Sequence, residues 1–193
     1  MINLPYESTS IKINEKDLPI YYFGNVSLLQ NPSISVTGSR KSSDLALEIL
    51  KTRIKSIAKK YTVVSGYANG ADEAAHLTAL QNDGTTIIVL PTGLKTFYIK
   101  SIYKSCWDWN RVLVISQFDI NSPWSSFNAF KRNEVIVGLS SKIISVHPGL
   151  SGGTYNATNM ALKTNKQIWV TDSKSDGVEL FVSAGAKKLN LGN

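Results

Sequence analysis

The chain has 193 residues, 42% of them hydrophobic, which is enough for one buried core. Its 21 lysines and arginines exceed its 14 acidic residues, and the resulting net charge of +7 favours phosphate-rich partners. It has no apolar run near the roughly 18 residues of a membrane span, no signal-peptide pattern, one cysteine, and two distant histidines, His76 and His147. These features exclude a membrane helix, an internal disulfide and a recognisable metal-ligand spacing, so we expect a soluble, cytoplasmic protein without a metal, another cofactor or a membrane partner.

Residues 1–30 are too apolar for a disordered tail, and we expect them to pack on the core as an N-terminal extension. Six apolar runs rich in β-branched residues then follow one another, and each is typical of a buried strand. They are Ile34 to Val36, Thr62 to Val64, Thr86 to Leu90, Val112 to Ile115, Ile143 to Val146, and Ile168 to Val170.

Helical patterns alternate with these runs. Residues 44–60 carry apolar side chains at helical spacing, and residues 73–80, after Asp72, predict a second helix. Residues 155–163, after Gly153 and Thr154, predict another, and residues 171–193 read as a loop, a short helix ending near Gly185 and a basic tail. Strand starts recur every 24 to 31 residues, roughly the length of a strand plus a crossover helix. The fold class is therefore α/β, a Rossmann-like three-layer αβα fold with a mostly parallel sheet, in a single domain over residues 1–193.

Glycine, serine and threonine gather in the turns that follow the strands. Because parallel strands end on one edge of a sheet, these turns converge there and present amides, hydroxyls and helix N-termini to an anion. The residues that we select as a phosphate-binding rim are Gly38, Ser39, Arg40, Lys41, Ser65, Gly66, Ser151, Gly152, Gly153 and Thr154. The alternative for any single turn is that its glycine only permits a tight backbone angle.

The segment from Ser125 to Ser141 places an aromatic residue beside two cations. Phe130 offers a ring on which a base can stack, and Lys131 and Arg132, followed by Asn133, offer contacts to neighbouring phosphates of a single strand. Read locally, it is equally consistent with a buried Phe130 and two solvated cations.

Six blocks together resemble the DprA (Smf) family of DNA-processing proteins. They are "LPIYYFGNVSLLQNPSISVTGSRK", "VVSGYANGADEAAH", "IIVLPTGL", "FKRNEVIVGLSSKIISV", "GLSGGTYNATNMALK" and "VELFVSAGAKKL", in the family's order over residues 18–189. The resemblance implies an extended Rossmann domain that binds single-stranded DNA in a basic pocket, forms a homodimer and helps to load a RecA-type recombinase. By position, the family's binding motifs fall on the residues selected above.

The chain departs from the family pattern at three places. Asn69 replaces an arginine of the family's "GLARGID" turn, Gln117 replaces a glutamate, and Glu134 replaces the second arginine of "RNR". Two of these changes reduce local positive charge. Natural transformation and a phage or defence setting are both open as cellular contexts.

Catalytic patterns are missing, so we expect a non-catalytic binder. Nucleotide hydrolases of the LOG type keep a glutamate in the turn that here reads Gly152 to Ala157, and a glycosidic bond needs such a carboxylate. Asp72 and His76 lie one helical turn apart, but we favour a capping Asp72 and a locally bonded His76 over a catalytic pair. Cys106 is expected to be a buried thiol. The alternative function is a LOG-like domain that senses or processes a free nucleotide.

Overall fold

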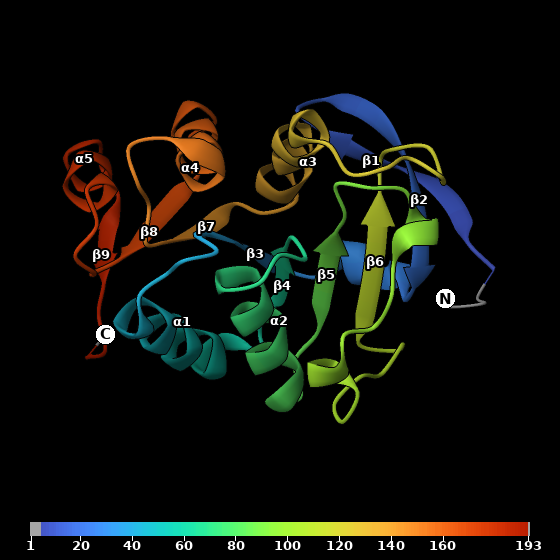
Figure 1. Cartoon of the computed structure of the whole chain (residues 1–193), viewed down its shortest axis with the longest axis horizontal. Coiled ribbons are helices and arrows are strands. Elements are labelled where there is room, and N and C mark those ends of the chain that lie inside the picture. Colours follow the sequence, from blue (N-terminus) through green and yellow to red (C-terminus); the bar gives the residue numbers. More distant parts are fainter. Residues whose placement is uncertain (1–4, 193) are drawn as a thin grey trace.

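The six apolar runs form the central strands of a nine-stranded sheet in the computed structural model, which describes residues 5–192 (Figure 1). These strands are β3 (Ser33–Gly38), β4 (Thr62–Ser65), β5 (Thr86–Val89), β6 (Val112–Ser116), β7 (Lys142–Val146) and β8 (Gln167–Thr171). They are nearly continuous in apolar residues because helices cover both faces of a parallel sheet.

The chain adds strands first on one side of β3 and then on the other. The sheet runs β1-β2-β6-β5-β4-β3-β7-β8-β9, and the strands from β6 to β9 pair in parallel. From β3 the chain builds outward through β4, β5 and β6, and it then returns to the other side of β3 with β7. The loops after β3 and β7 therefore leave in opposite directions and open a crevice between them, which is where open α/β sheets bind ligands.

The edges of the sheet carry strands that the sequence did not predict. Within the N-terminal extension that was expected to pack on the core, β1 (Glu7–Ile13) and β2 (Lys16–Gly24) form a hairpin, and β2 pairs antiparallel with β6 and widens the sheet. Ile11, Ile13 and Ile20 of this hairpin are buried in the core. At the other edge β9 (Lys187–Leu189) pairs with β8 where a basic tail was expected. Residues 1–4 of the predicted extension and residue 193 lie outside the described part, so the single domain over 1–193 stays a prediction.

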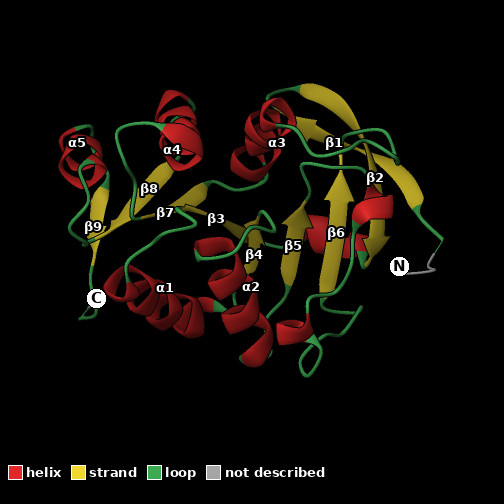
Figure 2. Cartoon of the chain, viewed as in Figure 1, coloured by secondary structure: helices red, strands yellow, loops and turns green. Residues whose placement is uncertain are grey.

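In the described part of the chain, five α-helices complete three layers, which confirms the predicted fold class (Figure 2). One face carries α1 (Asp44–Ile57) and α2 (Ala71–Gln81), and the other carries α3 (Ser126–Gly138), α4 (Gly152–Lys163) and α5 (Gly177–Ser183). No α-helix within residues 5–192 has the length and hydropathy that crossing a membrane requires.

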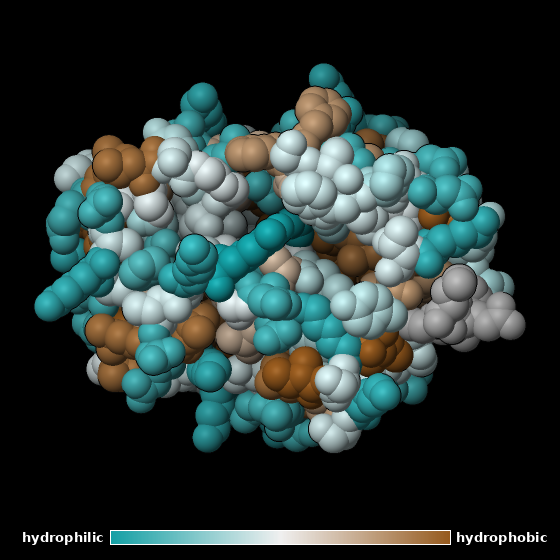
Figure 3. Space-filling model, in the orientation of Figure 1, coloured by the Kyte–Doolittle hydropathy of each residue, from teal (hydrophilic) through white to brown (hydrophobic). Residues whose placement is uncertain are grey.

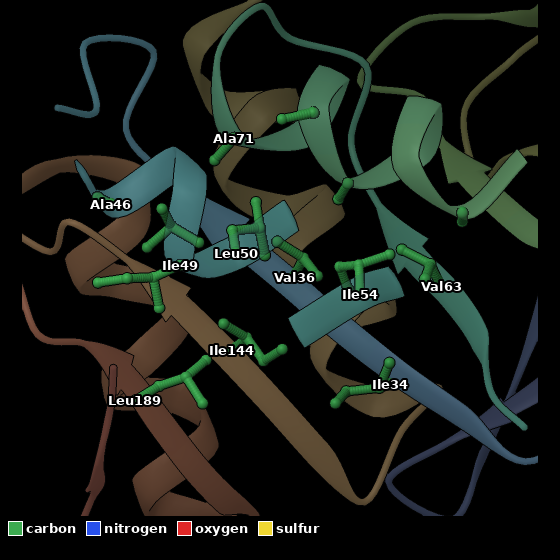
Figure 4. Close-up of a cluster of buried hydrophobic side chains, with 14 residues drawn as sticks. Ile34, Val36, Ala46, Ile49, Leu50, Ile54, Val63, Ala71, Ile144 and Leu189 are labelled. Atoms are coloured by element: carbon green, nitrogen blue, oxygen red, sulfur yellow. The ribbon is translucent and has the colours of Figure 1, made fainter. Parts of the chain in front are cut away.

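The core under α1 shows how sequence pattern becomes packing. The Ser43 side chain accepts a hydrogen bond from the Ala46 amide at 3.3 Å and caps the helix. The helix then buries one stripe of aliphatic side chains, Ile49, Leu50 and Ile54 among them, against β3 and β7 (Figure 4). This packing fixes where α1 begins, and with it the path of the loop between β3 and α1.

Candidate functional site

A hollow of about 640 Å³ opens at the reversal of strand order, between the loops that follow β3 and β7. We call it the switch-point hollow. Figure 3 shows the surface indented near its centre, with hydrophilic side chains at the rim. Its lining comes from the turns after β3, β4 and β7, the start of α2, the inner side of α3 with the loop before it, the start of α4 and the loop before α5: Thr37, Gly38, Ser39, Arg40, Lys41, Ala68, Asp72, Trp124, Ser126, Ala129, Phe130, Arg132, Asn133, Ile136, His147, Gly149, Ser151, Gly152, Gly153, Thr154, Lys174, Ser175 and Asp176.

The first turn of α4 presents open amides to this hollow. Ser151 precedes the helix without capping it through its side chain, and Gly152 has a φ of +86° that suits glycine. Apart from adjoining residues and the backbone of α4 itself, no described residue comes within 4 Å of where a Cβ would stand on Gly152 or Gly153. On the inner side, the Asn133 amide donates to the Gly153 carbonyl at 3.3 Å and fixes the turn. The helix start is thus held from behind and uncovered in front, which suits an anion.

The turn after β3 brings two cations to the opposite rim. A Cβ on Gly38 would lie 2.2 Å from the Ala71 Cβ and 2.8 Å from the Val146 Cβ, so only glycine lets α2 and β7 approach this closely. The Lys41 amide donates to the Ser39 hydroxyl at 3.0 Å, which turns the chain back on itself. Arg40 and Lys41 are exposed, and the Arg40 side chain forms no hydrogen bond or ion pair within residues 5–192. The Arg40 guanidinium is therefore free to meet a ligand.

Arg132 lies deeper than the sequence suggested. Its Nη1 donates to the Val89 carbonyl at 3.0 Å, while its buried Nε has no hydrogen-bond partner among the residues that the structure describes. Burial lowers the pKa of the guanidinium, and the carboxylate of Asp72 opposes this effect. Arg132 is thus a fixed positive charge in the floor of the hollow rather than a solvated side chain.

Three of the fourteen selected residues do not line the hollow. Ser65 and Gly66 are buried beneath it. The Ser65 hydroxyl lies 3.0 Å from Asp72 Oδ1, and a Cβ on Gly66 would clash with both Arg132 and Asp72. These two residues support the floor. Lys131 points outward, with its Nζ 5.9 Å from the centre of the Phe127 ring.

The other eleven all line the switch-point hollow, Phe130 among them with 43% of its surface exposed. Sequence reasoning overlooked Trp124 and Lys174, because each stands in an irregular loop whose path no periodicity reveals. The signal for Trp124 was its place just before the segment Ser125 to Ser141.

Asp72 and His76 do not form an accessible pair. Asp72 accepts from the Ala68 amide at 3.2 Å, so it braces the preceding loop rather than capping its own helix. His76 Nε2 lies 2.5 Å from the Gly66 carbonyl and Nδ1 lies 2.6 Å from the Thr86 hydroxyl. Complete burial lowers the pKa of His76 to about 4, so the ring is neutral and serves packing.

Cys106 and metal chemistry offer no alternative centre. The Cys106 thiol is half-buried, donates to the Tyr103 carbonyl at 3.4 Å, and has a pKa that burial raises. Within residues 5–192 no group of three or more histidine, cysteine, aspartate or glutamate side chains is placed to hold a metal ion.

A second hollow of about 230 Å³ adjoins the first. It is lined by Arg40, Tyr67, Ala68, Leu90, Pro91, Thr92, Thr96, Phe97, Tyr98, Lys100, Trp124, Ala129 and Arg132. Five of these residues also line the switch-point hollow: Arg40, Ala68, Trp124, Ala129 and Arg132. We call it the aromatic hollow. None of the eight residues that line only the aromatic hollow is among the fourteen residues selected from the sequence.

Comparison with known proteins places this arrangement in a family. The model of the family described as DNA recombination-mediator protein A matches residues 4–191. The chain is 31% identical to DNA processing protein DprA of Streptococcus pneumoniae over 188 residues, covering 94% of this chain and 66% of that protein.

Two solved structures share the fold. The crystal structure of the S. pneumoniae protein superposes with a TM-score of 0.80 at 31% identity, covering 90% of this chain and 64% of that one. DNA processing protein A from Helicobacter pylori, whose structure concerns its mode of binding single-stranded DNA, superposes with a TM-score of 0.83 at 22% identity, covering 96% and 91%. The chain therefore belongs to the DNA recombination-mediator protein A family, which is the DprA/Smf family.

Proposed function

We propose that this chain binds single-stranded DNA along the switch-point hollow, as an accessory factor in DNA processing or recombination that does not alter the strand chemically. The observation that carries the proposal is the lining of that hollow. Open amides at the start of α4 face the free guanidinium of Arg40 across a space large enough for a nucleotide. Membership of the family and the binding reported for the H. pylori protein support the same ligand.

The charges favour a phosphate chain. Four cationic side chains, Arg40, Lys41, Arg132 and Lys174, line the hollow together with two carboxylates, Asp72 and Asp176. The Asp72 carboxylate already accepts hydrogen bonds from the Ala68 amide and the Ser65 hydroxyl, so its negative charge is largely stabilised within the protein. The balance left at the rim is positive, which draws a polyanion and predicts binding that weakens with salt.

Phe130 supplies the contact that distinguishes a nucleic acid from a simple anion. Phe130 belongs to α3, and its ring is partly exposed in the wall of the hollow. A base that leaves the strand can stack on it while the adjoining phosphates meet the cations. Because every base has a flat π-face, we expect little sequence preference.

The state of three reactive groups supports a binding role without chemistry. His76 is buried and neutral, Asp72 is engaged, and the Cys106 thiol lies outside both hollows with a raised pKa. Asn156 stands in the turn where a LOG-type hydrolase keeps its glutamate. None of these groups offers a base or nucleophile to a strand in the hollow.

Fluorescence anisotropy with a labelled oligothymidylate tests the proposal. We expect tighter binding of the single strand than of a duplex of the same length, and similar affinities for strands of mixed sequence. The oligonucleotide should remain intact after prolonged incubation. Equal or tighter binding of duplex, or cleavage of the strand, contradicts it.

A free nucleotide is the second candidate, since a volume of 640 Å³ lies within the range of small-molecule sites. Under that reading a mononucleotide at micromolar concentration raises the melting temperature, and oligonucleotides do not. Under the first reading the oligonucleotide gives the larger shift.

Family membership also leads us to propose a homodimer, a RecA-type recombinase as partner and a cytoplasmic location. Leu180 on α5 is exposed and offers apolar surface for self-association. Light scattering of wild type and Leu180→Glu tests the dimer, which the substitution should weaken.

A further inference from the structure

We propose that the aromatic hollow holds a second base of the strand whose phosphates lie in the switch-point hollow, with Tyr98 and Trp124 as its stacking surfaces. The inference rests on the proposed function and adds to it a second base position. The strand would then cross the boundary formed by Arg40 and Arg132, with phosphates at the boundary and one base on either side.

The two rings at the mouth of the aromatic hollow are unusually exposed for their size. Tyr98 has 60% of its surface exposed and Trp124 has 55%, and both line the hollow. Large aromatic side chains normally bury most of their area, because water solvates their faces poorly. Their faces are therefore available to another flat group.

The floor of the aromatic hollow is rigid. The Tyr67 ring lies 5.2 Å from the Phe97 ring and 5.7 Å from the Tyr103 ring, stacked on the latter at 20°. Its hydroxyl donates to the Tyr98 carbonyl at 3.2 Å, and burial raises the pKa of Tyr67 to about 12, so the ring stays neutral. A preformed floor avoids the entropy of ordering side chains when a ligand arrives.

The charges of this hollow suit a base rather than a phosphate. Lys100 is the one cation that lines the aromatic hollow without also lining its neighbour. Its Nζ lies 2.8 Å from Asn69 Oδ1, 3.1 Å from Glu73 Oε2 and 4.9 Å from the centre of the Tyr67 ring. Its charge is thus neutralised within the protein, in contrast to the free Arg40 next door. What remains is an apolar slot with hydroxyls of Thr92 and Thr96 at its edge.

The aromatic hollow is smaller than the switch-point hollow and continuous with it. The aromatic hollow has about a third of the volume of its neighbour, at 230 Å³ against 640 Å³, and five shared residues make the two one continuous surface. Figure 3 shows hydrophobic side chains inside the indented region, on the side where β5 and β6 lie in the same orientation of Figure 1. A strand bound in the larger hollow can therefore reach the smaller one without leaving the protein surface.

The test compares Tyr98→Ala with Tyr98→Phe on two strands of equal length, an oligothymidylate and a strand of abasic deoxyribose units. Removal of the ring should weaken oligothymidylate binding about 5- to 150-fold and leave the abasic strand unchanged. Tyr98→Phe keeps the ring and should bind like wild type. Tyr6→Ala, an exposed tyrosine that lines neither hollow, is the matched control and should have no effect.

Two results overturn the inference while leaving the proposed function intact. One is an unchanged affinity of Tyr98→Ala for oligothymidylate, with Arg40→Ala weakening it. The other is an equal loss of Tyr98→Ala on both strands, which assigns Tyr98 to holding the fold. If wild type binds neither strand, the proposed function fails, and the inference falls with it.

Discussion

The Arg40→Ala variant puts the phosphate assignment to a quantitative test. Three cations at the rim of the switch-point hollow have side chains that are not committed within the described residues in the way Arg132 is: Arg40, Lys41 and Lys174. Each phosphate neutralised by a cation on a single strand adds about 0.7 to the slope of log affinity against log salt. If all three act, the wild-type slope is about −2.1, and Arg40→Ala reduces it to about −1.4.

These slopes predict different losses in one titration. Between about 50 and 200 mM salt, wild type should lose about 18-fold in affinity for oligothymidylate and Arg40→Ala about 7-fold. Anisotropy at four or more salt concentrations measures both. Lys51→Ala removes an exposed lysine of α1 outside the hollow and should keep the wild-type slope. A slope for Arg40→Ala equal to that of wild type refutes the reasoning, even if its affinity is lower.

Three further predictions concern the rim, the fold and pH. Gly153→Asp has room for its side chain and places a carboxylate at a helix start, so it should keep or raise thermal stability while lowering oligonucleotide affinity at least tenfold; unchanged affinity contradicts the anion site. Gly38→Ala forces its Cβ against Ala71 and Val146 and should lower the free energy of unfolding, measured by urea titration, by about 1–3 kcal/mol. A variant as stable as wild type would mean that the neighbouring side chains move aside without cost. The pKa of His76 is near 4 in the folded chain and about 6.5 when unfolded. Its contribution to the free energy of unfolding is therefore complete above about pH 6.5, and it falls by about 2–3 kcal/mol on acidification to about pH 4.5. His76→Gln should lack that part of the pH dependence, and an unaltered profile would mean that the ring is not buried neutral.

The centre of the fold was readable from the sequence, and its edges were not. Strands β4 to β8 are mostly apolar and β3 contributes Ile34 and Val36 to the core, because both faces of these strands are covered, so local pattern and tertiary role agree. Strand β1 is mostly exposed and polar, and β2 contains Pro19, which is tolerated where a ladder bond is not needed. These strands exist because they pair with each other and with β6, which is a tertiary fact.

The candidate site divides in the same way. The turns after β3 and β7 were found because strand ends converge by topology, which the alternation of strands and helices already implies. The burial of Gly66 could not be predicted from the sequence, since it depends on Arg132 of α3, which lies against Gly66 and donates to the Val89 carbonyl. The burial of Ser65 depends likewise on tertiary contacts of its hydroxyl with Val36 and Asp72. Tyr98 and Trp124 were missed because they stand in irregular loops, where no period marks the direction of a side chain.

The most direct test of the central claim is a residue-resolved footprint of the bound strand. Amide NMR spectra of the labelled protein, titrated with oligothymidylate, should show the largest shifts at the amides of Gly152, Gly153 and Thr154, in the first turn of α4 at the switch-point hollow. Shifts that gather on β1 and β2 instead, with these amides unmoved at saturation, would contradict the account.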